Sequence, residues 1–363
     1  ANTTATLNTA VGAYSSDAIT TGSSNTAVGA YSLSDSTTAS NNTAIGAYAL
    51  NETTTGDLNT AVGKNSLGVN TVGGRNVGVG AQTLDANTSG SYNIGIGYNA
   101  LSANTTADGN VAVGYNGLGS NTTGVGNTAI GQDVMDSNTT GNNNTAVGKS
   151  SLGANSTGVS NVGVGKDALE VNTTGSYNTA VGTDALDALT TGSQNVAIGN
   201  AALGSDTKGS KSIAIGESAL FAQNFTSATD TYNVAIGENA GTAVTTGIRN
   251  TLIGGLAGDA LTDADYNIAI GMNALSADTL GSKSIAIGVD ALQAQNFTSA
   301  TDTYNVAIGF QSAVALTTGI RNIAIGGLAL DATTTGNDNV AIGTSALSAN
   351  TVGASNTAIG KSA

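Results

Sequence analysis

The sequence contains no cysteine, no histidine, no proline and no tryptophan, and charged residues make up only 9% of it. Without cysteine there are no disulfides and no redox site. Without histidine or cysteine, no Ser-His or Cys-His nucleophile can form, and the usual ligands of transition metals are missing. We therefore expect no enzyme activity, no metal site and no cofactor.

Long apolar runs and clustered positive charges are also missing. No apolar stretch approaches the roughly 18–20 residues that span a bilayer, so we expect no membrane contact within this segment. The formal net charge is −14, and nucleic acid or an anionic membrane would need clustered Lys and Arg, so we expect neither as a partner. The first residues, Ala1 to Thr4, have neither the basic nor the apolar region of a signal peptide.

The sequence does contain one recurring motif, first seen without variation as Asn-Thr-Ala-Val-Gly at residues 25–29. Counted from Asn8, the motif occurs 21 times, and its last residue is Gly in every copy. The copies follow a 17-residue period, except for two longer steps, from Ser212 to Asn233 and from Ser284 to Asn305. A period this strict is typical of a solenoid. We predict that residues 1–363 form one continuous, all-β parallel solenoid of about 21 coils, with long coils at 212–232 and 284–304.

Within each coil, positions are counted from the opening Asn as position 0. Position 3 is Val or Ile in every coil, whereas position 2 is Ala, Gly or, once, Leu252. Side chains alternate along a strand, so positions 1 and 3 share one face and position 2 lies on the other. We interpret the Val/Ile face as the core. Position 8, usually Leu, predicts a second inward row, and the Gly at position 4 predicts a corner with positive φ or a close neighbour.

The Asn at position 0 opens 19 of the 21 coils, with Ser212 and Ser284 as the exceptions. Stacked identical Asn side chains can form a hydrogen-bonded ladder along a stack of strands. We therefore interpret this Asn as structural. Positions 12 to 14 read Thr-Thr-Gly or a close variant, as at residues 54–56, which predicts a turn that leads to the next coil.

This motif, followed by an Ala-Leu or Ser-Leu pair, resembles the repeats of trimeric autotransporter adhesin heads and of phage tail fibres. The resemblance covers nearly the whole chain and implies a left-handed parallel β-roll, with three chains around a shared axis. The 17-residue coil is longer than the typical head repeat. The neck, stalk and anchor of those adhesins have no counterpart in this sequence.

The small side chains at position 2 favour such an assembly, because a row of Ala makes a poor solvent face but suits a second packed interface. Repeated over all coils, the buried area would make the assembly obligate. We predict that the row packs between chains; its representatives are Ala27, Ala44, Ala61, Ala129, Ala180, Ala214, Ala307 and Ala341.

Two further readings concern polar rows. Ice-binding proteins use regular Thr columns on a flat solenoid face to bind ice, so the Thr-Thr columns leave ice binding open as an alternative. Six Asn-x-Thr/Ser sequons fall at position 11, where glycans would form a column on the outer edge; they begin at Asn87, Asn104, Asn121, Asn138, Asn155 and Asn172.

The aromatic residues form another set. Tyr14, Tyr31 and Tyr48 occupy position 6 of successive coils, where we expect them to stack. Each long coil contains four extra residues, which predict a lobe that bulges outward. We consider these lobes the best candidates for a ligand or adhesion site; their aromatic residues are Phe225, Tyr232, Phe297 and Tyr304.

The resulting hypothesis is a structural and adhesive fibre segment, an adhesin head or tail-fibre shaft, in which a rigid homotrimeric rod provides reach and multivalent attachment. Its partner is then the chain itself, together with a host or environmental surface. The expected location is extracellular, on a cell surface or a virion. A filament subunit that stacks end to end and an ice-binding solenoid are the alternatives.

Overall fold

The computed structural model describes residues 4–363; the segment Ala1–Thr3, which bears on the signal-peptide prediction, lies outside the described residues. The chain forms two compact units, Ala1–Tyr177 and Asn178–Ala363. Both are built in the same way, and each is described by itself. Whether residues 1–363 form one continuous domain therefore stays a prediction.

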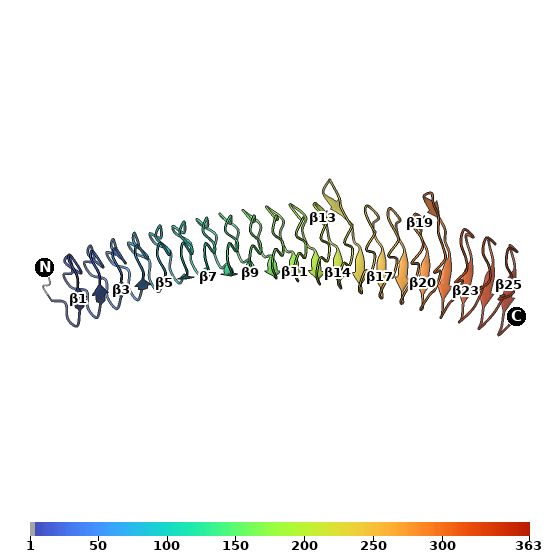
Figure 1. Cartoon of the computed structure of the whole chain (residues 1–363), viewed down its shortest axis with the longest axis horizontal. Coiled ribbons are helices and arrows are strands. Elements are labelled where there is room, and N and C mark those ends of the chain that lie inside the picture. The colour runs from blue at the N-terminus through green and yellow to red at the C-terminus, as the bar shows by residue number, and fades with distance from the viewer. Residues whose placement is uncertain (1–3) are drawn as a thin grey trace. The chain divides into compact units, whose positions relative to one another are not determined.

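The fold is an all-β parallel solenoid of about 21 turns with a spacing of about 17 residues, which confirms the fold class predicted from the repeat. Each coil contributes one three-residue strand at positions 1 to 3 of the motif, and the rest of the coil consists of turns and bends. Figure 1 shows the coils stacked one after another within each unit, with the strands along the same edge.

The strands of the first unit are β1 (Thr9–Val11), β2 (Thr26–Val28), β3 (Thr43–Ile45), β4 (Thr60–Val62), β5 (Val77–Val79), β6 (Ile94–Ile96), β7 (Val111–Val113), β8 (Thr128–Ile130), β9 (Thr145–Val147) and β10 (Val162–Val164). The main strands of the second unit are β11 (Thr179–Val181), β12 (Val196–Ile198), β14 (Ile213–Ile215), β16 (Val234–Ile236), β17 (Thr251–Ile253), β18 (Ile268–Ile270), β20 (Ile285–Ile287), β22 (Val306–Ile308), β23 (Ile323–Ile325), β24 (Val340–Ile342) and β25 (Thr357–Ile359). Two short pairs join each long coil to the coil before it: β13 (Gly209–Ser210) with β15 (Thr229–Asp230), and β19 (Gly281–Ser282) with β21 (Thr301–Asp302).

Within each unit, neighbouring strands pair in parallel and in register, so that every position of the motif lies beside the same position of the next coil. Between β2 and β3, for example, Thr26 pairs with Thr43 and Ala27 with Ala44. The long coils keep this register, because β14 still pairs with β16 across the four extra residues. The insertion is therefore absorbed outside the strand layer.

The Gly at position 4 is required for both predicted reasons. Gly29 has a φ of 141°, a conformation that side-chain-bearing residues rarely adopt. A Cβ on Gly29 would also lie 2.5 Å from the carbonyl oxygen of Gly46 in the next coil. Close stacking of the coils at this corner thus excludes every other residue.

The second inward row, at position 8, is confirmed by the complete burial of residues such as Leu33 and Leu50. These leucines lie in a turn rather than in a second strand, and Leu33 has a φ of 52°. A left-handed conformation costs an L-residue roughly 1–2 kcal/mol. Burial of the leucine side chain, worth about 1.5–3 kcal/mol, offsets this cost.

The assignment of the two strand faces is wrong, because the side chains at position 2 point into the coil. The alanines proposed to pack between chains are all 0% exposed in a single chain, so no partner chain can reach their side chains; they are Ala27, Ala44, Ala61, Ala129, Ala180, Ala214, Ala307 and Ala341. Where position 8 carries a large side chain, the interior is too narrow for a residue larger than Ala at position 2. Where Gly78 replaces Ala, an added Cβ would already lie 2.5 Å from the Ser66 hydroxyl oxygen.

The Val and Ile side chains at position 3 therefore face outward, together with those at position 1. Away from the terminal strands β1 and β25, the most exposed of them show 36–42% of their surface; they are Val28, Ile45, Val79, Ile94, Ile96, Ile130, Ile198, Ile213, Ile236, Ile308, Ile323, Ile325 and Ile342. No charged residue occupies either position in any coil. We call this uncharged surface of positions 1 and 3 the strand face.

Candidate functional surfaces

The Asn at position 0 forms the predicted ladder. Asn59 donates from its backbone N to the side-chain Oδ1 of Asn42 at 2.8 Å, and its Nδ2 donates to the carbonyl oxygen of Gly73 at 2.9 Å. All three residues repeat in the neighbouring coils, and the Asn side chains are buried. Each Asn thus connects its own coil to the one before it and also closes the turn at position 14. Its role is structural.

The sequon asparagines at position 11 also point inward, so the outer glycan column considered for them cannot form on the folded chain. Asn104 donates from Nδ2 to Asn87 Oδ1 at 2.9 Å and to the Ala107 carbonyl oxygen at 3.1 Å. All six are 0% exposed, which leaves no room for a glycan; they are Asn87, Asn104, Asn121, Asn138, Asn155 and Asn172. They form a second Asn ladder, which the sequence analysis missed.

The first Thr of a Thr-Thr pair uses its hydroxyl within the chain. Thr54 Oγ1 donates to the carbonyl oxygen of Thr71 at 3.1 Å, and Thr122 Oγ1 donates to that of Thr139 at 3.0 Å. These hydroxyls are therefore not available as a regular array toward water. The first Thr row therefore serves coil stacking. The second Thr of the pairs, such as Thr55 and Thr123, is exposed, so ice binding stays a prediction.

The tyrosines of position 6 stack as predicted. The rings of Tyr14 and Tyr31 are 4.9 Å apart between centroids, and those of Tyr31 and Tyr48 are 5.1 Å apart. Tyr98 and Tyr115 form a second, shorter stack at 5.7 Å. Because the ring faces contact one another, mainly the edges of these rings are open to solvent.

A column of alternating cations and tyrosines runs along seven successive coils of the second unit, at the residue that precedes the opening Asn or Ser. Its members are Lys211, Tyr232, Arg249, Tyr266, Lys283, Tyr304 and Arg321. Each Lys or Arg up to Lys283 lies over the ring of the following tyrosine, at 5.1–5.3 Å from the centroid. Arg321 instead pairs through two nitrogens with Asp338, at 2.6 and 2.8 Å.

The four predicted lobe residues separate into two kinds. Phe225 and Phe297 are only 7% exposed, so their rings belong to the chain's own packing and not to a ligand surface. Tyr232 and Tyr304 are 48% and 52% exposed. Their partners, Lys211 with Asp230 and Lys283 with Asp302, were missed in the sequence. Cation and carboxylate come from successive coils but from different positions of the coil, an offset that the 17-residue period does not reveal.

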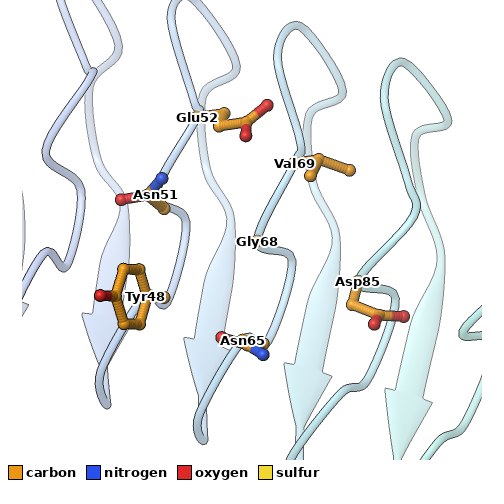
Figure 2. A pocket seen from close by; sticks show the side chains of 7 residues that line it. All are labelled: Tyr48, Asn51, Glu52, Asn65, Gly68, Val69 and Asp85. Atoms are coloured by element: carbon orange, nitrogen blue, oxygen red, sulfur yellow. The ribbon is translucent and has the colours of Figure 1, made fainter.

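A shallow groove crosses three successive coils of the first unit (Figure 2) and has a volume of about 220 Å³. Its lining residues are Tyr48, Asn51, Glu52, Asn65, Gly68, Val69 and Asp85. Partial burial raises the pKa of the Asp85 carboxyl. The groove is smaller than the roughly 300–1,000 Å³ of a typical ligand pocket. Its carboxylates, Glu52 and Asp85, come from different coils.

A second groove of about 280 Å³ lies farther along the same unit and includes Asp133, Asp136 and Glu170 in its lining. Burial, together with the charge of Asp133, raises the pKa of Asp136. Within residues 4–363, no group of three or more carboxylates is arranged to hold a metal ion. Both grooves are thus smaller than a typical ligand pocket.

Comparison of the chain with known protein families finds no family model that matches it, and comparison with curated proteins finds no match either. Its fold alone places the chain in the class of parallel β-solenoid repeat proteins. Within the described part of the chain, no helix has the length and apolar character needed to cross a bilayer.

Proposed function

We propose that this chain is a structural segment of an extracellular surface fibre, in which copies of the chain associate side by side through the strand face. The observation that carries the proposal is the combination of buried residues at position 2, mostly Ala, with outward Val and Ile at position 3, which repeats through the inner coils. Large apolar surfaces exposed on a soluble chain are typical of protein interfaces.

The area of the strand face supports stable association. Because every coil adds two outward side chains, the area of the strand face grows with the number of coils toward the ~800 Å² per partner of a standard interface. The face carries no charge, whereas charged residues such as Lys149 and Glu217 lie two residues after the strand. An apolar centre with a polar rim is the usual composition of such an interface.

The number of chains is proposed as three, on the resemblance of the repeat to adhesin heads and tail fibres. Location on a cell surface or virion and the absence of enzyme activity belong to the same proposal. Side-by-side copies would present each surface feature several times, which gives multivalent attachment without a high-affinity site. Association of copies end to end stays a prediction.

The mass of the chain in solution, measured by sedimentation or light scattering, tests this proposal. Ile96→Lys and Ile130→Lys place charges on the strand face without disturbing the interior, so we expect this double variant to be monomeric with an unchanged circular dichroism spectrum. Gln132→Lys, two residues from Ile130 on the exposed rim, is the matched control and should remain an oligomer. A wild-type chain that is monomeric at every concentration contradicts the proposal.

A further inference from the structure

Two lobes project from the second unit. They consist of residues 224–231 and 296–303, where the long coils leave the 17-residue path. Figure 1 shows them beside β13 and β19, extending beyond the other coils on the same side. They lie four coils apart, which at roughly 4.8 Å per coil is about 19 Å. Their residues are identical in type, in order and in exposure.

The base of each lobe is held by a buried polar network. Asp206 accepts hydrogen bonds through Oδ1 from the backbone N of Gly209 at 2.9 Å and of Phe225 at 3.3 Å. Its Oδ2 accepts from Gln223 Nε2 at 2.5 Å. The second lobe has the same network around Asp278. This network explains why the buried lobe residues are the same in both copies.

Packing does not explain the identity of the exposed lobe residues. Thr226 and Ser227 are exposed at the tip. The same two residue types recur at 298 and 299. By contrast, exposed Phe221 has become Gln293 in the corresponding coil body. The tip is thus a repeated chemical surface, not only a repeated fold.

At the side of each tip lies a charge-balanced aromatic cluster. Lys211 Nζ is 2.6 Å from Asp230 Oδ2 and donates to the Tyr232 hydroxyl at 3.1 Å. The Lys211 ammonium also lies 5.1 Å from the centre of the Tyr232 ring. In the second lobe, Lys283 pairs in the same way with Asp302 and Tyr304. Each cluster presents a fixed, half-exposed tyrosine between a paired cation and anion.

This chemistry excludes two common kinds of ligand. A protein interface needs an apolar core. Phe225 is buried, and residues 226–230 at the tip are only Thr, Ser, Ala and Asp, so the tip has no large apolar side chain to form such a core. A polyanion needs unpaired cations, whereas Asp230 neutralises Lys211 and the chain carries a net charge of −14. Hydroxyls, a neutral ion pair and an aromatic ring remain, and these groups complement an uncharged polyol.

We propose that each lobe is a binding subsite for a neutral polysaccharide, with Tyr232 or Tyr304 contacting a sugar ring and the Lys–Asp pair and tip hydroxyls bonding its hydroxyl groups. The two lobes are identical and lie in one unit, so they fit a polymer that presents the same unit repeatedly. Occupation of both lobes by one polymer strengthens binding through the effective concentration of the second subsite. This inference rests on the attachment role in the proposed function and names its target.

Binding of four neutral polysaccharides (dextran, mannan, xylan and laminarin) and two polyanions (heparin and alginate) to the immobilised full chain tests the inference by biolayer interferometry. We expect saturable binding of at least one neutral polymer and of neither polyanion. Tyr232→Ala combined with Tyr304→Ala should weaken that binding at least tenfold, and each single variant should weaken it less. Tyr92→Ala is the matched control, because Tyr92 also stacks under a cation, Arg75, but has no lobe beside it.

Absence of binding to all four neutral polymers, or equal binding by the double variant, overturns the inference. Hydrogen exchange at residues 224–231 checks that the variants keep the lobe folded. The outcome is independent of self-association, since both lobes lie on one chain. A monomeric wild type would contradict the fibre proposal while the binding assay still reports on the lobes.

Discussion

Leu252 occupies the space that a leucine at position 8 fills in most other coils. An added Cβ on Gly258 would lie 2.7 Å from Leu252 Cδ2, and one on Gly241 would lie 2.6 Å from Leu252 Cδ1. Position 2 of this coil carries Leu252 instead of Ala. Position 8 is Gly in the same coil (Gly258) and in the coil before it (Gly241). The core therefore stays filled, but the leucine that fills it comes from the strand instead of the turn.

This exchange makes the first prediction. Leu252→Ala should lower the free energy of unfolding of the second unit by about 2–5 kcal/mol, because it leaves a cavity that the neighbouring glycines cannot fill. Adding Gly258→Leu restores the arrangement of the other coils and should recover at least half of the loss. Gly258→Leu alone should destabilise by overpacking. Urea unfolding of the four chains measures the coupling, and additive effects of the two substitutions would contradict it.

The Asn ladder makes the second prediction. Asn110 Oδ1 accepts from the backbone N of Asn127 at 2.9 Å, and Asn110 Nδ2 donates to the Gly124 carbonyl oxygen at 2.8 Å. Asn110→Ala leaves the backbone N–H of Asn127 buried without a partner, whereas the Gly124 carbonyl oxygen still accepts from Asn121 Nδ2 at 3.0 Å. The unpaired N–H should cost about 1–3 kcal/mol. Hydrogen exchange of the Asn127 amide should accelerate in parallel. Asn200→Ala, at an exposed position, should change the urea midpoint very little.

The lobe network makes the third prediction. In Asp206→Asn, the amide nitrogen faces a hydrogen-bond donor in either orientation. That donor is Gln223 Nε2 in one orientation and the backbone N–H groups of Gly209 and Phe225 in the other, so hydrogen bonds of the network are lost in both. Gln223 cannot rotate to compensate without losing its bond to Asn233, which its Oε1 accepts at 2.8 Å. We expect faster hydrogen exchange at residues 225–231. The unmodified second lobe, residues 296–303, serves as an internal control.

Uniform exchange in both lobes of this variant would show that the carboxylate is not needed to hold the insertion. A surface substitution, Asp263→Asn, removes an exposed carboxylate that accepts from Thr246 Oγ1 at 2.6 Å. It should leave both lobes unchanged.

The Lys283–Asp302 pair makes the fourth prediction. Its hydrogen bond lowers the pKa of the Asp302 carboxyl from the ordinary 3.8 and raises the pKa of Lys283 from the ordinary 10.5. The carboxylate contribution is complete above 3.8 and is lost as the pH falls through the lowered value. The ammonium contribution is complete below 10.5 and is lost as the pH rises through the raised value.

The cluster beside Tyr304 should therefore stay intact between these limits and loosen first in acid. Carboxyl chemical shifts followed by NMR report the pKa of Asp302 directly. In Lys283→Met we expect this pKa to move back toward 3.8. An unchanged pKa in the variant would show that the ion pair does not form in solution.

The sequence was sufficient to predict the fold, because the 17-residue period fixes the coil and its Gly corners regardless of which face is buried. It was not sufficient to orient the strand. Alternation requires that Ala27 and Val28 point to opposite sides, but either side can be the interior. Hydrophobicity favoured Val28, whereas the available volume decided for Ala27, since Leu33 and the Asn side chains fill the rest of the coil.

The same ambiguity affected the lobe. Four extra residues required a bulge, and the structure contains one. The direction of Phe225 depends on a network that begins at Asp206, 19 residues earlier and therefore in the preceding coil. The pairing of Lys211 with Asp230 also joins successive coils. Contacts of this kind depend on how the insertion folds, which no local pattern in the sequence specifies.

The register of the strands and the Asn ladder have a consequence for how such a chain changes in length. Each coil bonds only to its immediate neighbours, and it presents to the next coil the same groups that it receives from the one before. A tandem duplication of whole coils in the gene therefore produces contacts that already fit. The two long coils, 212–232 and 284–304, carry identical lobes. They are the expected product of such an event, which copies a ligand subsite in the same step that lengthens the protein.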